Sequence, residues 1–151
     1  MPFAGGERVG APRRYTATVS MTPAELRARL VRLRSEAGAV GVCAVDGAGR
    51  QVAMAGEVDE DVRRGAFRRM TAVGVAGSLV RERGHDFRDE ARAMNVHARL
   101  VGGRLVLVVT YDGETATGRV VLSSRHADAE MAERVRDDDR YARVRPRDDG
   151  S

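Results

Sequence analysis

Lysine is absent from this chain of 151 residues, so arginine supplies its basic side chains apart from three histidines. A phosphate-binding loop of the type G-x-x-x-x-G-K-[ST] requires lysine, and so does any mechanism that forms a Schiff base. The chain is therefore not itself a phosphate-loop nucleotide hydrolase.

Tryptophan is also absent, and aromatic residues make up only 4% of the sequence. Few platforms are left on which nucleic-acid bases could stack. The formal net charge is +4, but Asp and Glu alternate with Arg along most of the chain, which is typical of a solvated surface. We therefore expect no nucleic-acid partner.

Only one cysteine is present, Cys43, and no apolar run is long. A single cysteine forms no intramolecular disulfide, which favours a reducing compartment. No run reaches the ~20 apolar residues that a membrane-spanning helix needs, and the first residues lack the apolar centre of a signal peptide. We expect a cytoplasmic protein without a membrane span, with Cys43 as a core residue rather than a reactive thiol.

The clearest structural signal is a hairpin over residues 96–109, where two apolar runs flank Gly102-Gly103. Such a pair is typical of a two-residue turn, because both turn positions need positive φ. The cross-strand pairs that this loop length predicts are Leu100–Leu105, Ala98–Leu107 and Val96–Val109 on one face, with Arg99–Val106 and His97–Val108 on the other. The first strand is then apolar on one face only. Leu105–Val109 is apolar on both, which predicts a strand covered above and below.

Other elements follow from capping signals and periodicity. Thr22-Pro23-Ala24-Glu25 has the pattern of a capping box that begins a helix, and Gly38 suits its end. Residues 40–46 and 51–55 predict a second hairpin, and Phe87–Ala93 predicts a short polar edge strand. Residues 114–135 predict a last helix whose inward positions are Ala116, Val120, Ala127, Met131 and Val135.

Residues 62–83 predict a long helix, ended by Gly84, that is apolar over a wide arc. Ala66 and Met70 lie in the stripe expected to face the sheet, and small residues recur beside it. The small residues, among them Gly74 and Gly77, have two interpretations: a local kink, or close packing against another copy of the chain, which we prefer. The residues expected near the symmetric contact are Ala72, Val73, Gly74, Val75, Ala76 and Leu79.

The predicted fold is α/β (α+β), with the element order α-β-β-α-β-β-β-α. We expect a five-stranded antiparallel sheet with the long helix on one face and the N- and C-terminal helices on the other. Length allows one domain. We place it at residues 21–135, between a flexible arm at 1–20 and a charged, disordered tail at 136–151.

No motif in the sequence predicts enzymatic chemistry. His85, His97 and His126 belong to different elements, without Cys or carboxylate residues at metal-ligand spacing, so we predict no metal site and no cofactor. Asp46-Gly47 and Asp112-Gly113 both follow strands, where turn chemistry explains them better than paired catalytic acids do.

Several segments resemble the roadblock / dynein light-chain family, and within it the bacterial MglB-type proteins. The similarity covers about residues 26–135. Its most specific part runs from Val101-Gly102-x-Arg104 through Leu107-Val108-Val109 to Tyr111-Asp112. Further matches are Val45-Asp46 with Gly49, Ala55-Gly56-Glu57-Val58, Met70-Thr71-Ala72, Val75-Ala76, and Thr115, Gly118, Val120 and Leu122.

The resemblance implies a homodimer on which a small Ras-like GTPase docks. MglB-type members act as GTPase-activating proteins in bacterial polarity and motility, and are thought to reshape the GTPase without donating an arginine finger. In this chain Arg63, Arg64, Arg68 and Arg69 are candidates for the partner-binding surface, although a plain solvated face explains them equally well. The alternative is a dimeric scaffold or light-chain-like adaptor that tethers partners without affecting nucleotide hydrolysis. A sensor with an enclosed small-ligand pocket is the least favoured hypothesis.

Overall fold

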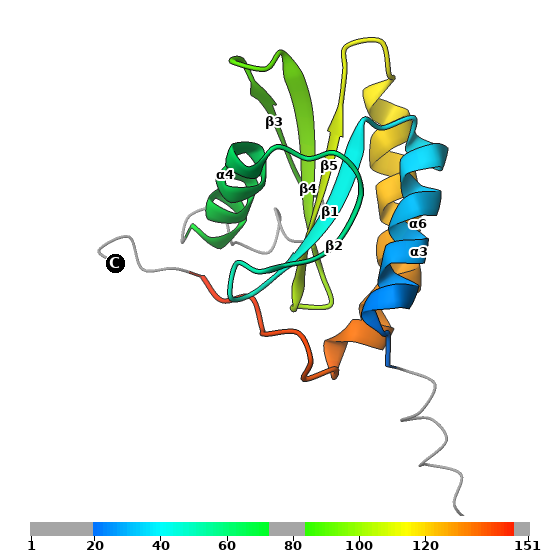
Figure 1. The fold of residues 1–151 in the computed structure, drawn as a ribbon, viewed down its shortest axis with the longest axis vertical. Helices are drawn as coiled ribbons and strands as arrows, with labels where there is room; N and C mark the ends of the chain where they lie inside the picture. The colour runs from blue at the N-terminus through cyan, green and yellow to red at the C-terminus, as the bar shows by residue number, and fades with distance from the viewer. Residues whose placement is uncertain (1–19, 73–83, 147–151) are drawn as a thin grey trace, which may run out of the picture.

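The computed structural model describes residues 20–72 and 84–146, which form a central sheet with helices on both faces (Figure 1). The strand order is β2-β1-β5-β4-β3, with every neighbouring pair antiparallel. Helices α3 and α6 lie side by side on one face, and α4 lies on the other. The elements are α3 (Pro23–Ala37), β1 (Gly41–Asp46), β2 (Gln51–Gly56), α4 (Glu60–Thr71), β3 (His85–Asp89), β4 (Met94–Val101), β5 (Leu105–Tyr111) and α6 (Thr117–Arg136). The predicted fold class, layers and element order are confirmed.

Helix α3 begins as its sequence predicts. The hydroxyl of Thr22 accepts a hydrogen bond from the backbone N–H of Glu25, and the carboxylate of Glu25 accepts one from the N–H of Thr22. Gly38 ends the helix in the left-handed conformation, with φ of 68°. The apolar stripe that faces the sheet is fully buried, at Leu26, Leu30, Leu33 and Ala37.

The central hairpin forms, but its predicted register is wrong by one residue. Gly102 and Gly103 both have positive φ, as the turn requires, yet the ladder resumes at Val101–Leu105 instead of Val101–Arg104. Arg104 belongs to the turn: its N–H donates to the main-chain oxygen of Val101 at 3.2 Å, and its guanidinium bonds to the main-chain oxygens of Arg136 and Tyr141. The observed pairs include Leu100–Val106, Ala98–Val108, Val96–Thr110, Arg99–Leu107 and His97–Val109.

This register decides which face of β4 is polar. Val96 and Ala98 now point toward α4, whereas His97 and Arg99 lie under α6. Both polar side chains are buried, and each has an acidic partner. β4 is therefore apolar on one face only, as predicted. Every residue of β5 is buried, which confirms that this strand is covered on both sides.

Helix α6 begins three residues later than the sequence suggests. Val120, Ala127, Met131 and Val135 are buried as predicted, but Ala116 is an exposed N-cap residue, so its predicted inward position is wrong. The polar strand β3 lies at the edge of the sheet, as predicted.

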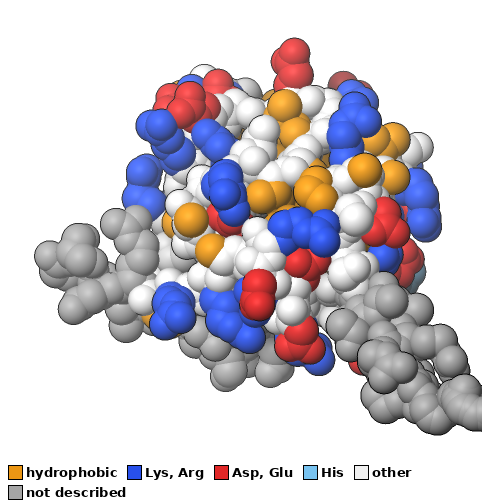
Figure 2. All heavy atoms as spheres, turned by 60° about the horizontal axis from the view of Figure 1, so that its bottom comes forward, with side chains coloured by type: hydrophobic (Ala, Val, Ile, Leu, Met, Phe, Trp, Pro, Cys, Tyr) orange, Lys and Arg blue, Asp and Glu red, His pale blue; other side chains and the backbone are white. Residues whose placement is uncertain are grey.

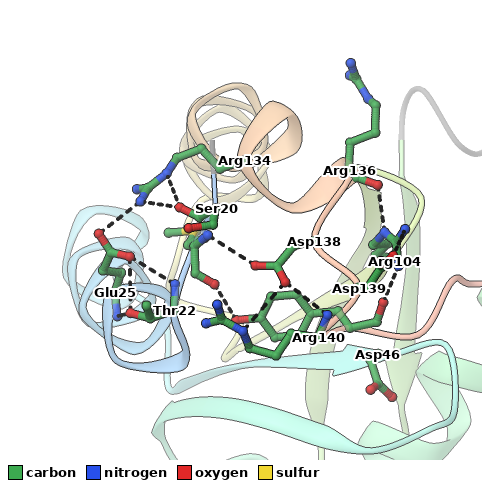
Figure 3. A network of polar contacts seen from close by, with 12 residues as sticks. Ser20, Thr22, Glu25, Asp46, Arg104, Arg134, Arg136, Asp138, Asp139 and Arg140 are labelled. Carbon is green, nitrogen blue, oxygen red and sulfur yellow. Dashed lines mark hydrogen bonds and ion pairs between the residues drawn. The ribbon is translucent and has the colours of Figure 1, made fainter. Parts of the chain in front are cut away.

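The segment after α6 is ordered through Pro146, and the prediction of disorder from Arg136 is wrong for residues 136–146. Tyr141 is only 1% exposed, and its hydroxyl donates to the main-chain oxygen of Met21 at 2.7 Å. The carboxylate of Asp138, also buried, accepts from the N–H of Met21 (Figure 3). A prediction from average composition overlooked one aromatic side chain that anchors the segment. The predicted arm at residues 1–19 lies outside the described residues.

A second anchor of this segment is Arg104, which is 6% exposed. Its guanidinium donates to the main-chain oxygens of Arg136 and Tyr141, each at 2.7 Å, and pairs with Asp139 (Figure 3). Farther along, the N–H of Val144 donates to the main-chain oxygen of Gly103 at 2.8 Å. We call residues 137–146 the C-terminal strap, because they cross the end of the sheet where the β1–β2 and β4–β5 turns lie (Figure 1).

Candidate functional site

Helix α4 carries the candidate partner-binding arginines, and its sequence explains where it starts. Asp59 is the N-cap, with its carboxylate accepting from the N–H of Asp61 at 2.8 Å. Glu60 and Asp61 occupy the first turn and Arg68 and Arg69 the last, which complements the helix dipole. Val62, Ala66 and Met70 are buried against the sheet, so the arginines are left on the sides of the helix.

The described helix ends at Thr71, twelve residues before the predicted end at Arg83. The hydroxyl of Thr71 donates back to the main-chain oxygen of Phe67, and Ala72 is extended, with φ of −63° and ψ of 142°. Side-chain bonding of Thr to the preceding turn competes with the helical pattern. Ala72 is therefore not helical. The other predicted contact residues, Val73, Gly74, Val75, Ala76 and Leu79, lie outside the described residues.

Three of the four candidate arginines surround one cavity of about 280 Å³ between α4 and the β1–β2 turn. Arg64 and Arg68 are exposed, whereas the side chain of Arg63 is 19% exposed. In the view of Figure 2, arginine side chains lie on both sides of the visible surface, with acidic side chains among them. The residues that line the cavity are Val45, Gly49, Arg63, Arg64, Phe67 and Arg68.

A well-braced turn forms the wall of the cavity opposite the helix. The buried carboxylate of Asp46 accepts from the N–H groups of Ala48 and Arg50 and pairs with the Arg50 guanidinium at 2.7 Å. These contacts confirm a turn role for Asp46. Gly49 has φ of 81°, and a Cβ there would lie 3.7 Å from the ring of Phe67. Residue 49 therefore brings the main chain of the turn close to Phe67, with a φ that favours glycine.

The cavity is positively charged. The carboxylate of Glu60 forms an ion pair with Arg64 and a longer one, at 3.6 Å, with Arg63. One negative charge is therefore shared by two guanidinium groups. Arg68 forms no ion pair with a carboxylate of the described residues. Arg68 thus remains available to an acidic ligand, beside the partly exposed ring of Phe67.

Arg69 lies apart from the other three. Its guanidinium stacks on the ring of Phe87 from β3, 4.2 Å from the ring centroid. Such a cation–π contact stabilises by about 0.5–1 kcal/mol at an exposed site. Sequence reasoning grouped the four arginines because they are close in the chain, whereas the structure directs Arg69 toward the β3 edge.

Half-buried apolar side chains flank α4 on the same face of the sheet. Met54 of β2 lies on one side, and Phe87 of β3 and Leu100 of β4 lie on the other. Helix α4 as described therefore covers only the middle of this face. Among the described residues, that arrangement leaves apolar surface and the outer edge of β3 available for packing.

Cys43 and His97 are titratable residues that are buried and have structural roles. Cys43 is fully buried, and burial raises the pKa of its thiol to about 12, in agreement with its expected core role. The Nδ1 atom of His97 lies 2.7 Å from the Asp86 carboxylate, and this hydrogen bond holds the pKa of Asp86 below its usual range. Within residues 20–72 and 84–146, no group of His, Cys, Asp and Glu has the arrangement of a metal site. No helix in these ranges is long and apolar enough to cross a membrane.

The cavity itself was not predicted. Arg63, Arg64 and Arg68 were named from their positions on one helix, but the opposing wall comes from a turn that precedes them by about fifteen residues. The only sequence signal was the glycine-rich turn at Gly47-Ala48-Gly49, which predicts a reversal and not a site.

No family model and no curated protein sequence matches the chain. Solved structures do match. Myxococcus xanthus MglB is 26% identical with a TM-score of 0.60, over 73% of this chain and 86% of that one. The gliding protein MglB from Thermus thermophilus is 20% identical with a TM-score of 0.54, over 83% and 91%. An MglB described as having a tetrameric arrangement is also 20% identical, with a TM-score of 0.53.

These likenesses show that the chain has an MglB-type, roadblock-like fold, which confirms the resemblance inferred from its sequence. The two structures at 20% identity bear on the fold alone. Myxococcus MglB is also similar in sequence, though modestly, and the alignment takes in most of its length.

Proposed function

We propose that this chain, which has the fold of the MglB proteins, is a homodimeric regulator of a small Ras-like GTPase, and that it stimulates GTP hydrolysis. The observation that carries the proposal is the likeness to Myxococcus xanthus MglB, combined with an arginine-lined cavity on the helix where the partner was expected to dock. By the same likeness, we place the protein in bacterial polarity or motility.

In this proposal the chain supplies no catalytic group of its own. Phosphoryl transfer depends mainly on positioning and on stabilising charge around the transferred phosphate. A regulator accelerates it by selecting the conformation in which the GTPase's own residues are correctly placed, so it must bind that conformation more tightly than the others. Arg63, Arg64, Arg68 and Arg69 contact the protein surface of the GTPase rather than the nucleotide.

Self-association is proposed to use the α4 face. It is supported by the apolar side chains beside α4 and by the position of β3 at the edge of the described sheet. The proposed contact includes Ala72, Val73, Gly74, Val75, Ala76 and Leu79. A Leu79→Arg variant should sediment as a monomer, whereas a variant that stays wholly dimeric would remove this interface.

The function is tested with a Ras-like GTPase from the same genome. Single-turnover GTP hydrolysis should accelerate saturably when this chain is added, by at least about tenfold, which corresponds to about 1.4 kcal/mol of barrier. Binding without acceleration would instead establish the adaptor function. Absence of both binding and acceleration would overturn the proposal.

A further inference from the structure

We infer that the cavity between α4 and the β1–β2 turn receives an acidic side chain of the protein partner, held by Arg64 and Arg68 beside the ring of Phe67. This inference rests on the proposed function and deepens it, because it states which chemistry on the partner this surface recognises. It also separates Arg69, which stacks on Phe87, from the arginines that read the partner's charge.

Charge is the first argument. Three arginines line the cavity, and among the described residues the carboxylate that pairs with them is that of Glu60, since Asp46 is paired with Arg50. Arg68 has no acidic partner among the described residues, so binding a carboxylate there breaks no existing ion pair. Like charges held close together repel one another, and an incoming anion relieves that repulsion.

The shape of the cavity is the second argument. Its volume of about 280 Å³ suits one or two side chains and not a folded element. The partly exposed ring of Phe67 is an apolar surface against which the methylene groups of Glu, or a neighbouring aliphatic residue, would lie. A guanidinium group matches a carboxylate in plane and spacing, so two parallel hydrogen bonds form. The ligand we assign is therefore a Glu or Asp next to an apolar residue.

Rigidity is the third argument. The wall opposite α4 is fixed by the hydrogen bonds that Asp46 makes within the β1–β2 turn. Val144 of the C-terminal strap packs on the same apolar cluster as Val45 and Phe67, and its main chain is bound to Gly103. Binding to such a surface orders few new groups, and the entropy cost of association falls accordingly.

The first test measures the affinity of charge-reversed variants for the GTPase by titration calorimetry. Arg68→Glu and Arg64→Glu should each weaken binding at least tenfold, and Arg68→Lys should recover part of the loss. Arg125→Glu is the matched control, because Arg125 is exposed on α6, on the opposite face of the sheet. It should change the affinity less than twofold. Wild-type affinity should fall as salt is raised.

A second test does not depend on the GTPase. An acetyl-Leu-Glu-Leu-Glu-amide peptide is titrated into the ¹⁵N-labelled protein, with the Gln-containing peptide as its control. The inference predicts amide shifts at Gly49 and at residues 63–68 with the acidic peptide only, and their loss in Arg68→Glu.

The two tests separate failure of the inference from failure of the proposed function. If wild type and both Glu variants bind the GTPase equally, the cavity is not the docking site, while regulation of the GTPase still holds. If the wild-type protein binds no GTPase, the proposed function fails. The peptide titration then still tests whether the cavity binds an acidic side chain. Shifts specific to the acidic peptide would support it, and their absence would overturn it.

Discussion

Tyr141 offers the sharpest test of how the C-terminal strap is held. Its ring is buried and its hydroxyl donates to the main-chain oxygen of Met21 at 2.7 Å, which joins the strap to the residue before the N-cap of α3. Burial raises the pKa of this phenol, so it remains a neutral donor at physiological pH. Two substitutions separate the contribution of the hydroxyl to stability from that of the ring.

Tyr141→Phe removes one hydrogen bond and leaves the Met21 oxygen without that donor. The expected loss in the free energy of unfolding is about 1–2 kcal/mol. Tyr141→Ala also removes the buried ring, and substitutions of this kind cost about 3–5 kcal/mol. For a domain of this size about 4 °C is lost per kcal/mol. The unfolding midpoint should therefore fall by about 4–8 °C for Tyr141→Phe and about 12–20 °C for Tyr141→Ala.

Thermal and urea unfolding followed by circular dichroism measure both variants. Arg143→Ala is the control within the strap, because the Arg143 side chain is exposed, and it should change stability by less than about 0.5 kcal/mol. If Tyr141→Ala and Arg143→Ala unfold at the same midpoint, the strap does not pack as described and the reasoning is refuted.

Three further predictions concern the turn, the core thiol and the first helix. In urea unfolding, Gly102→Ala should lower the free energy of unfolding more than Gly103→Ala. Only a Cβ at residue 102 would collide with α6, because it would lie 2.5 Å from a methyl of Val135. Equal losses of stability in the two variants would contradict this packing. The thiol of Cys43 should react with a thiol reagent only when the protein unfolds, since its pKa is about 12; rapid labelling of the native protein would contradict its burial. Hydrogen bonds from the Thr22 N–H and from Arg134 lower the pKa of Glu25 from 4.5 to about 2. The ionised Glu25 carboxylate therefore stabilises the folded protein fully above pH 4.5, and this stabilisation is lost as the pH falls toward 2. Glu25→Gln should thus be less stable than wild type at pH 6 and equally stable near pH 2, and a difference independent of pH would contradict this linkage.

Local signals in the sequence predicted local structure well. The capping box at Thr22 and Glu25 depends on residues three apart, and Leu26 and Leu30 follow with the helical period, so neighbouring residues contain the whole pattern. The fold class was likewise accessible, because β5 is apolar on both faces and β4 on one.

The errors arose where distant residues decide the local conformation. In the β4–β5 hairpin Arg104 lies in the turn and not in the ladder, and its guanidinium bonds to the main-chain oxygens of Arg136, at the end of α6, and of Tyr141 in the strap. Nothing within the hairpin itself signals those partners. The strap was missed for the same reason, since Tyr141 is a single aromatic residue in a charged segment and finds its contact 120 positions earlier, at Met21.

The candidate site was predicted in part. Three of the four arginines on α4 do line one cavity, but the turn that completes it comes from the β1–β2 hairpin, which only the folded sheet brings beside the helix. The separation of Arg69 from the others depends on Phe87, on the edge strand β3. The spacing of the arginines along one helix could predict neither the β1–β2 turn beside three of them nor the Phe87 ring beside Arg69.

The central claim is that this chain recognises a small Ras-like GTPase in its active conformation. The most direct measurement is the affinity for the GTPase from the same genome, loaded either with a non-hydrolysable GTP analogue or with GDP. The account predicts binding of the GTP-like form at least about tenfold more tightly than the GDP form, since a ligand shifts a conformational equilibrium only by its difference in affinity. Equal affinity for the two forms, or no binding to either, would contradict it.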